Sequence, residues 1–198
     1  MPSPNIQRAF DYLTGNEIVE RSGGKLQPMT PQGASGLIGG WIVETGKENL
    51  EELDVVEKGN NQAGRGISQF SHSRRPSYDA ARAAALKSGV DPNSIDFQLG
   101  YAVDEYVGKH DPAPGKSLSG WTKSFENFGQ AEDVRDAAIG FTSGLDGKEG
   151  YFRPTTPHMD RRVEAAQRVY SHMTAPQIPE VPTKPAPGMM TISPKYRK

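Results

Sequence analysis

One carboxylate of this chain stands on an apolar helical stripe, where an acidic side chain is unusual. In the segment LIGGWIVETG, Leu37, Trp41 and Glu44 fall on one face of a helix with about 3.6 residues per turn. The helix is expected to end at Gly46, which puts Glu44 in its last turn. Burial and the partial negative charge of a helix C-terminus both favour the protonated carboxyl. Such an acid can protonate the leaving oxygen of a glycosidic bond.

Periodicity alone leaves a simpler alternative open, because a glutamate in the last turn of a helix is commonly a solvated surface residue. Inverting glycoside hydrolysis also needs a second carboxylate, about 6.5–9.5 Å from the acid, to activate water. Asp54 and Glu57 follow the helix and precede a Gly-rich turn, so they are the candidates for this role. Each of them could equally be a surface acid.

A mainly α-helical chain must position these carboxylates. Thr30 and Pro31 are typical of a helix start, with the proline at the first helical position, and apolar residues follow at helical spacing. We expect roughly seven short helices around this buried central one, with a small irregular β-hairpin within residues 55–70. The other predicted helices cover residues 4–14, 77–89 with Ser77 as cap, 91–107, 121–128, 131–143 and 156–173.

Composition excludes several classes of function. The chain has 198 residues, of which 34% are hydrophobic, with 22 Gly and 16 Pro, which predicts one ordinary core with long irregular loops. The absence of cysteine excludes disulfides, cysteine-based zinc sites and thiol nucleophiles. The four histidines form no closely spaced pair, so we expect no metal and no cofactor. We also expect no membrane span and no signal peptide, because no apolar run is long enough.

The C-terminal end differs in character from the rest. Residues 176–198 hold six prolines, which exclude a packed helix or sheet and indicate an extended arm. Residues 151–198 carry eight Lys/Arg and three Asp/Glu, which gives this segment a charge of +5. The whole chain has a net charge of −1, so residues 1–150 carry −6. Net charge indicates no nucleic-acid partner, and the basic end is either solvated or docks on an acidic partner. The predicted organisation is a helical segment over 1–29, a domain over 30–173 and an arm over 174–198.

Five segments, taken in order along the chain, form a recognisable set. The first is TPQGASGLIGGWIVETG, in which an Ala/Gly-rich helix start leads to a Glu followed by Thr and Gly. The others are GRGISQF, SRRPSYDAARAAALKSGV, DFQLGYAVDEY, and VRDAAIGFTSG with YFRPTTPHMDRRVEAAQRVY. Together they resemble the phage tail lysozyme family, lysozyme-like glycoside hydrolases related to goose-type lysozymes and lytic transglycosylases. The resemblance covers about residues 30–173 and implies a lysozyme-like helical fold.

The resemblance implies roles for particular residues. It makes Glu44 the general acid and places GRGISQF along a sugar groove. There, Gly64 and Gly66 would let the backbone approach a sugar ring. The Gln69 amide would donate to and accept from hydroxyl or N-acetyl groups, and Phe70 would offer an apolar face. Gly64 and Gly66 could equally form a hairpin turn, and Tyr151 could instead pack in a turn. The predicted substrate contacts are Gly66, Ser68, Gln69, Phe70 and Tyr151. Trp41 and Trp121 are assigned to the core, with a sugar-stacking role as the alternative. Arg74 and Arg75 are assigned to solvated positions, with contact to peptide carboxylates of peptidoglycan as the alternative.

Some residues depart from the family pattern. Thr45 stands where Ser is common, Ser68 replaces Ala, and Phe70 replaces Trp. Lys47-Glu48 replaces an aromatic residue and Asn-Pro, and the acidic stretch that follows is longer than expected. These departures leave the acid in place and put the substrate fit in doubt. Because related transglycosylases work without a second carboxylate, the resemblance does not identify one.

The main functional hypothesis is a virion-associated peptidoglycan hydrolase of a bacteriophage. It would cleave between N-acetylmuramic acid and N-acetylglucosamine, as a muramidase or a lytic transglycosylase, and open the host cell wall for genome entry. We expect synthesis in the host cytoplasm, a place in the phage tail or internal core, and action in the host periplasm. The 174–198 arm would bind other virion proteins. The alternatives are a structural virion protein with little or no activity and a free lysis enzyme made late in infection.

Overall fold

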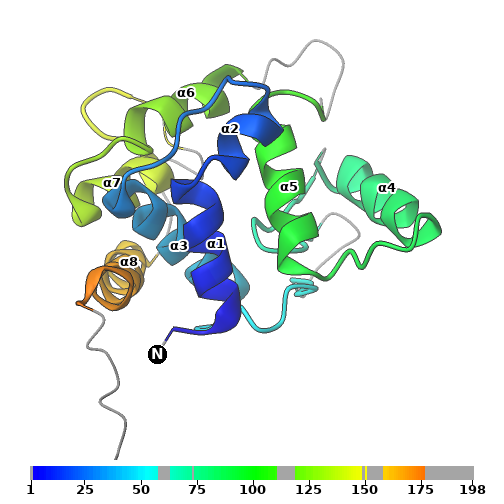
Figure 1. Ribbon diagram of the computed structural model, residues 1–198, viewed down its shortest axis with the longest axis horizontal. Helices are drawn as coiled ribbons and strands as arrows, with labels where there is room; N and C mark the ends of the chain where they lie inside the picture. Colours follow the sequence, from blue (N-terminus) through cyan, green and yellow to red (C-terminus); the bar gives the residue numbers. More distant parts are fainter. Residues whose placement is uncertain are drawn as a thin grey trace, which may run out of the picture.

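A computed structural model describes residues 2–57, 63–72, 74–110, 119–148, 150 and 158–176, without the side chains of 119–122. This part of the chain is mainly helical, as predicted, and contains eight helices (Figure 1). Their bounds are α1 Pro4–Thr14, α2 Glu17–Ser22, α3 Pro31–Thr45, α4 Arg74–Lys87, α5 Ile95–Tyr106, α6 Ser119–Phe128, α7 Val134–Ser143 and α8 Met159–Thr174. None of these described helices has the length and apolarity that a membrane span requires.

The ends of α3 follow from local chemistry. The Thr30 side chain accepts a hydrogen bond from the backbone N of Gly33 at 3.0 Å, and Pro31 occupies the first helical position. At the other end Gly46 adopts a left-handed conformation with φ of 64°, which a residue with a Cβ rarely takes. The predicted start and end of this helix are therefore confirmed.

Helix α3 is the buried centre of the fold, as predicted. Eleven of its fifteen residues are buried, including Leu37, Ile38 and Trp41. Its small residues let neighbouring backbones approach. A Cβ added at Gly36 would lie 2.8 Å from the backbone C of Ala137 on α7, and one added at Gly39 would lie 2.6 Å from the backbone N of Ala166 on α8. Glycine is therefore required where α7 and α8 pack directly on α3.

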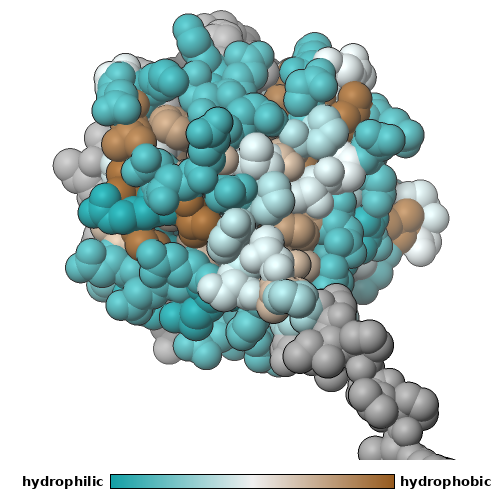
Figure 2. Space-filling model, turned by 60° about the vertical axis from the view of Figure 1, so that its left-hand side comes forward, coloured by the Kyte–Doolittle hydropathy of each residue, from teal (hydrophilic) through white to brown (hydrophobic). Residues whose placement is uncertain are grey.

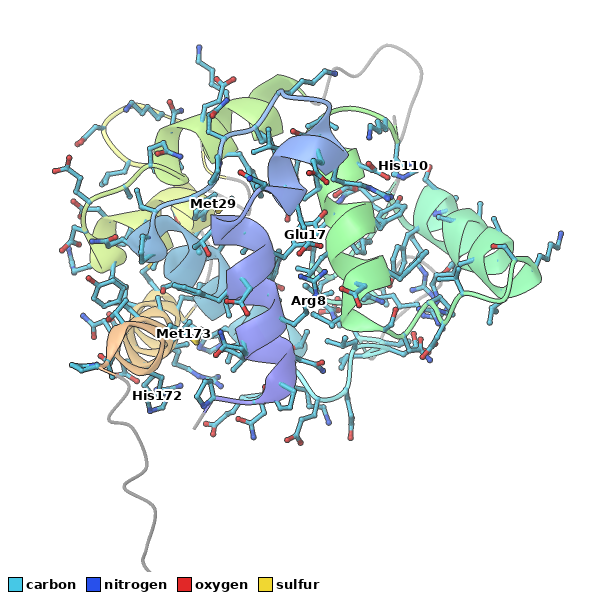
Figure 3. All side chains as sticks on the ribbon, in the orientation of Figure 1. Arg8, Glu17, Met29, His110, His172 and Met173 are labelled. Carbon is cyan, nitrogen blue, oxygen red and sulfur yellow. The ribbon has the colours of Figure 1, made fainter. Side chains whose placement is uncertain are left out.

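The N-terminal helices share the core of the rest of the chain. Ile6, Phe10 and Leu13 of α1 belong to the same hydrophobic cluster as Leu37 of α3. Figure 3 shows Arg8 on α1 and Glu17 on α2 lying close together. Arg8 donates to Glu17 at 2.6–2.7 Å and to Asp96 of α5 at 2.7 Å. The predicted segment 1–29 therefore packs on the predicted domain 30–173, and the boundary between them stays a prediction.

The predicted hairpin is reduced to a single antiparallel bridge between Val56 and Arg65. Around it, the backbone N of Glu57 donates to the O of Gly64 at 2.9 Å, and the N of Gly66 donates to the O of Val55 at 3.0 Å. These bonds join the two described ends of an irregular loop. The segment therefore takes the place that was predicted for the hairpin, without regular strands among its described residues.

Several predicted helix boundaries are wrong. Helix α2 was not predicted, because six residues are too few to show a period, yet it buries Ile18. Helix α4 begins at Arg74, ahead of the predicted cap Ser77, because Pro76 is tolerated in a first turn where no backbone N–H partner is needed. Three other helices start three or four residues later than predicted: α5 after its cap Ser94, α7 after its cap Asp133, and α8 at Met159.

Candidate active site

Glu44 lies in the last turn of α3, at the edge of the core. Its side chain is 23% exposed, which separates it from the fully buried Trp41 one turn earlier. Its Oε1 accepts a hydrogen bond from Nη2 of Arg162 at 2.6 Å. The carboxylate is therefore neither fully solvated nor enclosed in the core, and one of its two oxygens is held by a cation.

Arg162 reaches this carboxylate from α8. Its side chain is 4% exposed, and its Nη1 also contacts the backbone O of Gly40 at 3.4 Å. The close packing of Gly39 on Ala166 explains this position, because Ala166 lies one turn after Arg162 on the same face of α8. The contact between α3 and α8 thus delivers a buried guanidinium to the last turn of α3.

The electrostatic surroundings of Glu44 are only partly those expected from the sequence. Besides partial burial and the C-terminus of its helix, Glu44 has the guanidinium of Arg162 at 2.6 Å, a positive charge that the apolar stripe did not predict. A buried arginine is retained where its charge is paired, because an unpaired one would be strongly destabilising. The expectation that only apolar side chains surround Glu44 is therefore incomplete, because it lacks the charge of Arg162.

Asp54 is held by arginines. Nε and Nη2 of Arg65 donate to its two oxygens at 2.5 and 2.8 Å, and Nη2 of Arg82 lies 3.3 Å away. These hydrogen bonds from Arg65 lower the pKa of Asp54 against the opposing effect of burial, and Arg82 adds to the lowering. Asp54 is therefore an ionised carboxylate that ties the irregular loop to α4.

Glu57 is exposed beside the Val56–Arg65 bridge. Its Oε2 accepts from the backbone N of Gly64 at 3.3 Å. Of the two candidate bases, Glu57 has the more open side chain and Asp54 the more constrained one. Whether either serves as a second carboxylate stays a prediction.

The segment from Gly64 to Phe70 is anchored in the core. Gly66 has φ of 77°, and a Cβ there would lie 2.7 Å from Oε1 of Gln98 and would also strike the Tyr78 hydroxyl. Ser68 is 2% exposed, with its Oγ 3.4 Å from the hydroxyl of Tyr106. Gly66 is thus required by a turn that packs against buried side chains.

Gln69 and Phe70 end this turn in different ways. Gln69 is partly exposed, and its Nε2 donates to the backbone O of Gly66 at 2.9 Å. Phe70 is fully buried, with its ring centroid 4.4 Å from that of Tyr78 and 4.9 Å from that of Tyr101. The expectation that Phe70 offers its face to a ligand is not met in this structure, because its ring packs into an aromatic cluster.

A family model for phage tail lysozymes matches residues 17–173, which is most of the chain. The chain belongs to the phage tail lysozyme family. The match begins within α2, ahead of the predicted start at residue 30, and ends within α8. A comparison with curated proteins finds no match. Membership of a lysozyme family indicates a glycosidase-type hydrolase of peptidoglycan in general terms.

The other residues singled out from the phage tail lysozyme pattern have varied surroundings. Trp41 is fully buried, so its assignment to the core is confirmed. Tyr151 and the side chain of Trp121 lie outside the described residues. Arg74 and Arg75 were predicted to be solvated, which is wrong. Each is 16% exposed, Arg74 donating to Glu105 at 2.7–2.8 Å and Arg75 to Asp79 at 2.7 Å.

Arg162, the partner of Glu44 on α8, is the residue of this candidate site that sequence reasoning missed. Its signal is an arginine on a stripe otherwise made of Ala165, Ala166 and Val169, all buried on α8. An arginine at such a position needs a partner of opposite charge. The sequence does not show which carboxylate that is, because Glu44 is 118 residues away.

Proposed function

We propose that this member of the phage tail lysozyme family is a virion-associated peptidoglycan hydrolase that uses Glu44 as general acid. The observation that supports this most is the position of Glu44, a partly exposed carboxyl at the end of the central helix, held by a buried arginine. The bond cleaved would be that between N-acetylmuramic acid and N-acetylglucosamine. The protein would be carried in the phage tail or internal core and open the host cell wall for genome entry.

In the proposed reaction Glu44 donates its proton to the glycosidic oxygen. The bond between this oxygen and the anomeric carbon breaks, and the leaving sugar departs as a neutral alcohol. The anomeric carbon then bonds to an oxygen of water, in a muramidase, or to a hydroxyl of the same sugar, in a transglycosylase. The proton lost by that oxygen restores the acid through a base, for which Asp54 and Glu57 are the candidates.

The substrate would lie along the irregular loop beside α3. Gln69 and Arg65 are partly exposed polar residues of the Gly64–Phe70 segment, and Arg65 is already paired with Asp54. We propose that Gln69 contacts sugar hydroxyl or N-acetyl groups, while Gly66 and Ser68 shape the turn that carries it. Tyr151 is proposed as a further contact from its place in the sequence alone, directly before Phe152-Arg153-Pro154. The 174–198 arm is proposed to bind other virion proteins.

The test is digestion of purified peptidoglycan, with the products separated and identified by mass spectrometry. Glu44→Gln should lower the rate at least about 100-fold, the usual contribution of a general acid. Glu48→Gln is the matched control, because this glutamate is exposed and lies four residues further along the chain, beyond the end of α3. Anhydro ends would indicate a transglycosylase and reducible ends a muramidase. Equal cleavage by Glu44→Gln and wild type would refute the role of Glu44.

A structural virion protein with little activity is the second candidate. The burial of Ser68 and Phe70 favours it, since two residues expected at a sugar groove are instead committed to the core. Folded wild-type protein that releases no muropeptides would support this candidate. Activity lost in Glu44→Gln and kept in Glu48→Gln would exclude it.

A further inference from the structure

The guanidinium of Arg162 is anchored at two points of a single helical turn. Nη2 donates to Oε1 of Glu44 at 2.6 Å, and Nη1 lies 3.4 Å from the backbone O of Gly40. Gly40 precedes Glu44 by four residues, so the two anchors are the backbone and the side chain of the same turn. This fork ties the carboxyl group to its own helix and limits its rotation.

The arginine itself has little freedom to move. Its side chain is 4% exposed, and the adjoining turn of α8 lies against α3, where a Cβ on Gly39 would be 2.6 Å from the N of Ala166. A planar guanidinium in such packing presents its N–H groups in a fixed geometry, which an ammonium does not. The position of the Glu44 carboxyl is therefore tied to the packing of α8 on α3.

The two oxygens of Glu44 have different surroundings. Oε1 accepts from Arg162, whereas Oε2 has no hydrogen bond to the described part of the chain. A carboxylic acid can carry its proton on the second oxygen while the first accepts from a guanidinium. After the proton has left, the same guanidinium faces the new negative charge.

We infer that Arg162 is the positioning residue of Glu44, holding Oε1 so that Oε2 presents the proton to the glycosidic oxygen. This inference rests on the proposed function. Arg162 has no contact with substrate in this role, because its side chain is almost completely buried. It acts through the orientation of Glu44 and through the charge that Glu44 acquires.

The experiment compares Arg162→Met and Arg162→Lys with wild type on soluble, uncross-linked glycan strands of peptidoglycan. Methionine keeps an unbranched side chain without the charge, and lysine keeps the charge without the planar guanidinium that donates from two nitrogens. We expect Arg162→Met to lower kcat about 100-fold, the effect of roughly 1 Å of misplacement, with KM changed less than about threefold. Arg162→Lys should recover about tenfold of that loss, because it restores the charge alone.

The control is Arg21→Met, which removes a different arginine, one that donates from Nε and Nη2 to the two oxygens of a buried carboxylate, Asp104. All rates are measured at a temperature where circular dichroism shows each variant to be folded. We expect Arg21→Met to keep the kcat of wild type. A loss of structure without a role in positioning would change the folded fraction and leave kcat per folded molecule unchanged.

Each result decides the inference. Wild-type kcat in folded Arg162→Met, or a change confined to KM, would overturn it while leaving the proposed function intact. If Arg162→Met does not fold, folded Arg162→Lys decides: about tenfold lower kcat at constant KM supports the inference, and wild-type kcat refutes it. A folded wild-type protein that cleaves no glycan refutes the proposed function and the inference together.

Discussion

The contact between α3 and α8 makes a sharp prediction at Gly39. An alanine Cβ there would lie 2.6 Å from the N of Ala166 and 2.8 Å from its Cα and Cβ. Ordinary contact begins at 3.4 Å, so α8 would have to retreat by the difference, about 0.8 Å. Backbone atoms of a packed helix cannot rotate away as a flexible side chain can.

The cost of Gly39→Ala can be estimated from two opposing effects. Overpacking against a rigid neighbour costs about 3 kcal/mol, and replacing glycine by alanine within a helix returns about 1 kcal/mol, which leaves a loss of about 2 kcal/mol. The displacement would also carry Arg162 away from Glu44, because Arg162 lies one turn before Ala166 on α8. We therefore expect lower stability together with lower glycan cleavage per folded molecule.

The assay is urea unfolding followed by circular dichroism. The matched control is Gly100→Ala in α5, whose Cβ would have as its nearest neighbour the guanidinium of Arg21, at 3.3 Å, the end of a long side chain rather than backbone. This variant should be as stable as wild type or up to about 1 kcal/mol more stable. Adding Ala166→Gly to Gly39→Ala should not restore stability, because the N and Cα of residue 166 remain in the way. Wild-type stability of Gly39→Ala, or full rescue by Ala166→Gly, would refute the reasoning.

Three further predictions concern the irregular loop. Gly66→Ala should lower the free energy of unfolding by about 3 kcal/mol in thermal or urea unfolding, because it combines φ of 77° with a clash against Gln98. Gly46→Ala, with φ of 64° in open space, should lower it by only about 1 kcal/mol. Equal losses would contradict the packing argument. Phe70→Trp should lose about 1–3 kcal/mol, because the ring is fully buried, and unchanged stability would indicate an open site. The pKa of Asp54 is lowered, so its charge stabilises the fold above its ordinary pKa and this contribution is lost as pH falls through the lowered value. Asp54→Asn should therefore be less stable than wild type at neutral pH. The difference in urea midpoint between the two proteins should become smaller below about pH 4. A difference that stays constant with pH would contradict this assignment.

Much of the helical organisation could be predicted from local sequence. The bounds of α1 and the start of α3 follow from proline, a capping residue and apolar spacing, which act within one or two turns. The six-residue α2 and the early start of α4 could not be predicted in this way. Helix α2 is too short to show a period, and α4 is extended by a turn whose arginines pair with Glu105 and Asp79.

The sequence by itself determined that Glu44 lies in the last turn of a buried helix, because helical period and a terminal glycine are local properties. Tertiary structure alone decided what surrounds this carboxylate. Arg162 arrives from 118 residues away, since small residues on α3 let the backbone of α8 approach. The same holds for Phe70 of the irregular loop, whose burial depends on Tyr78 of α4 and Tyr101 of α5. A period along one segment specifies which face is apolar, whereas the identity of the partner depends on how the helices pack.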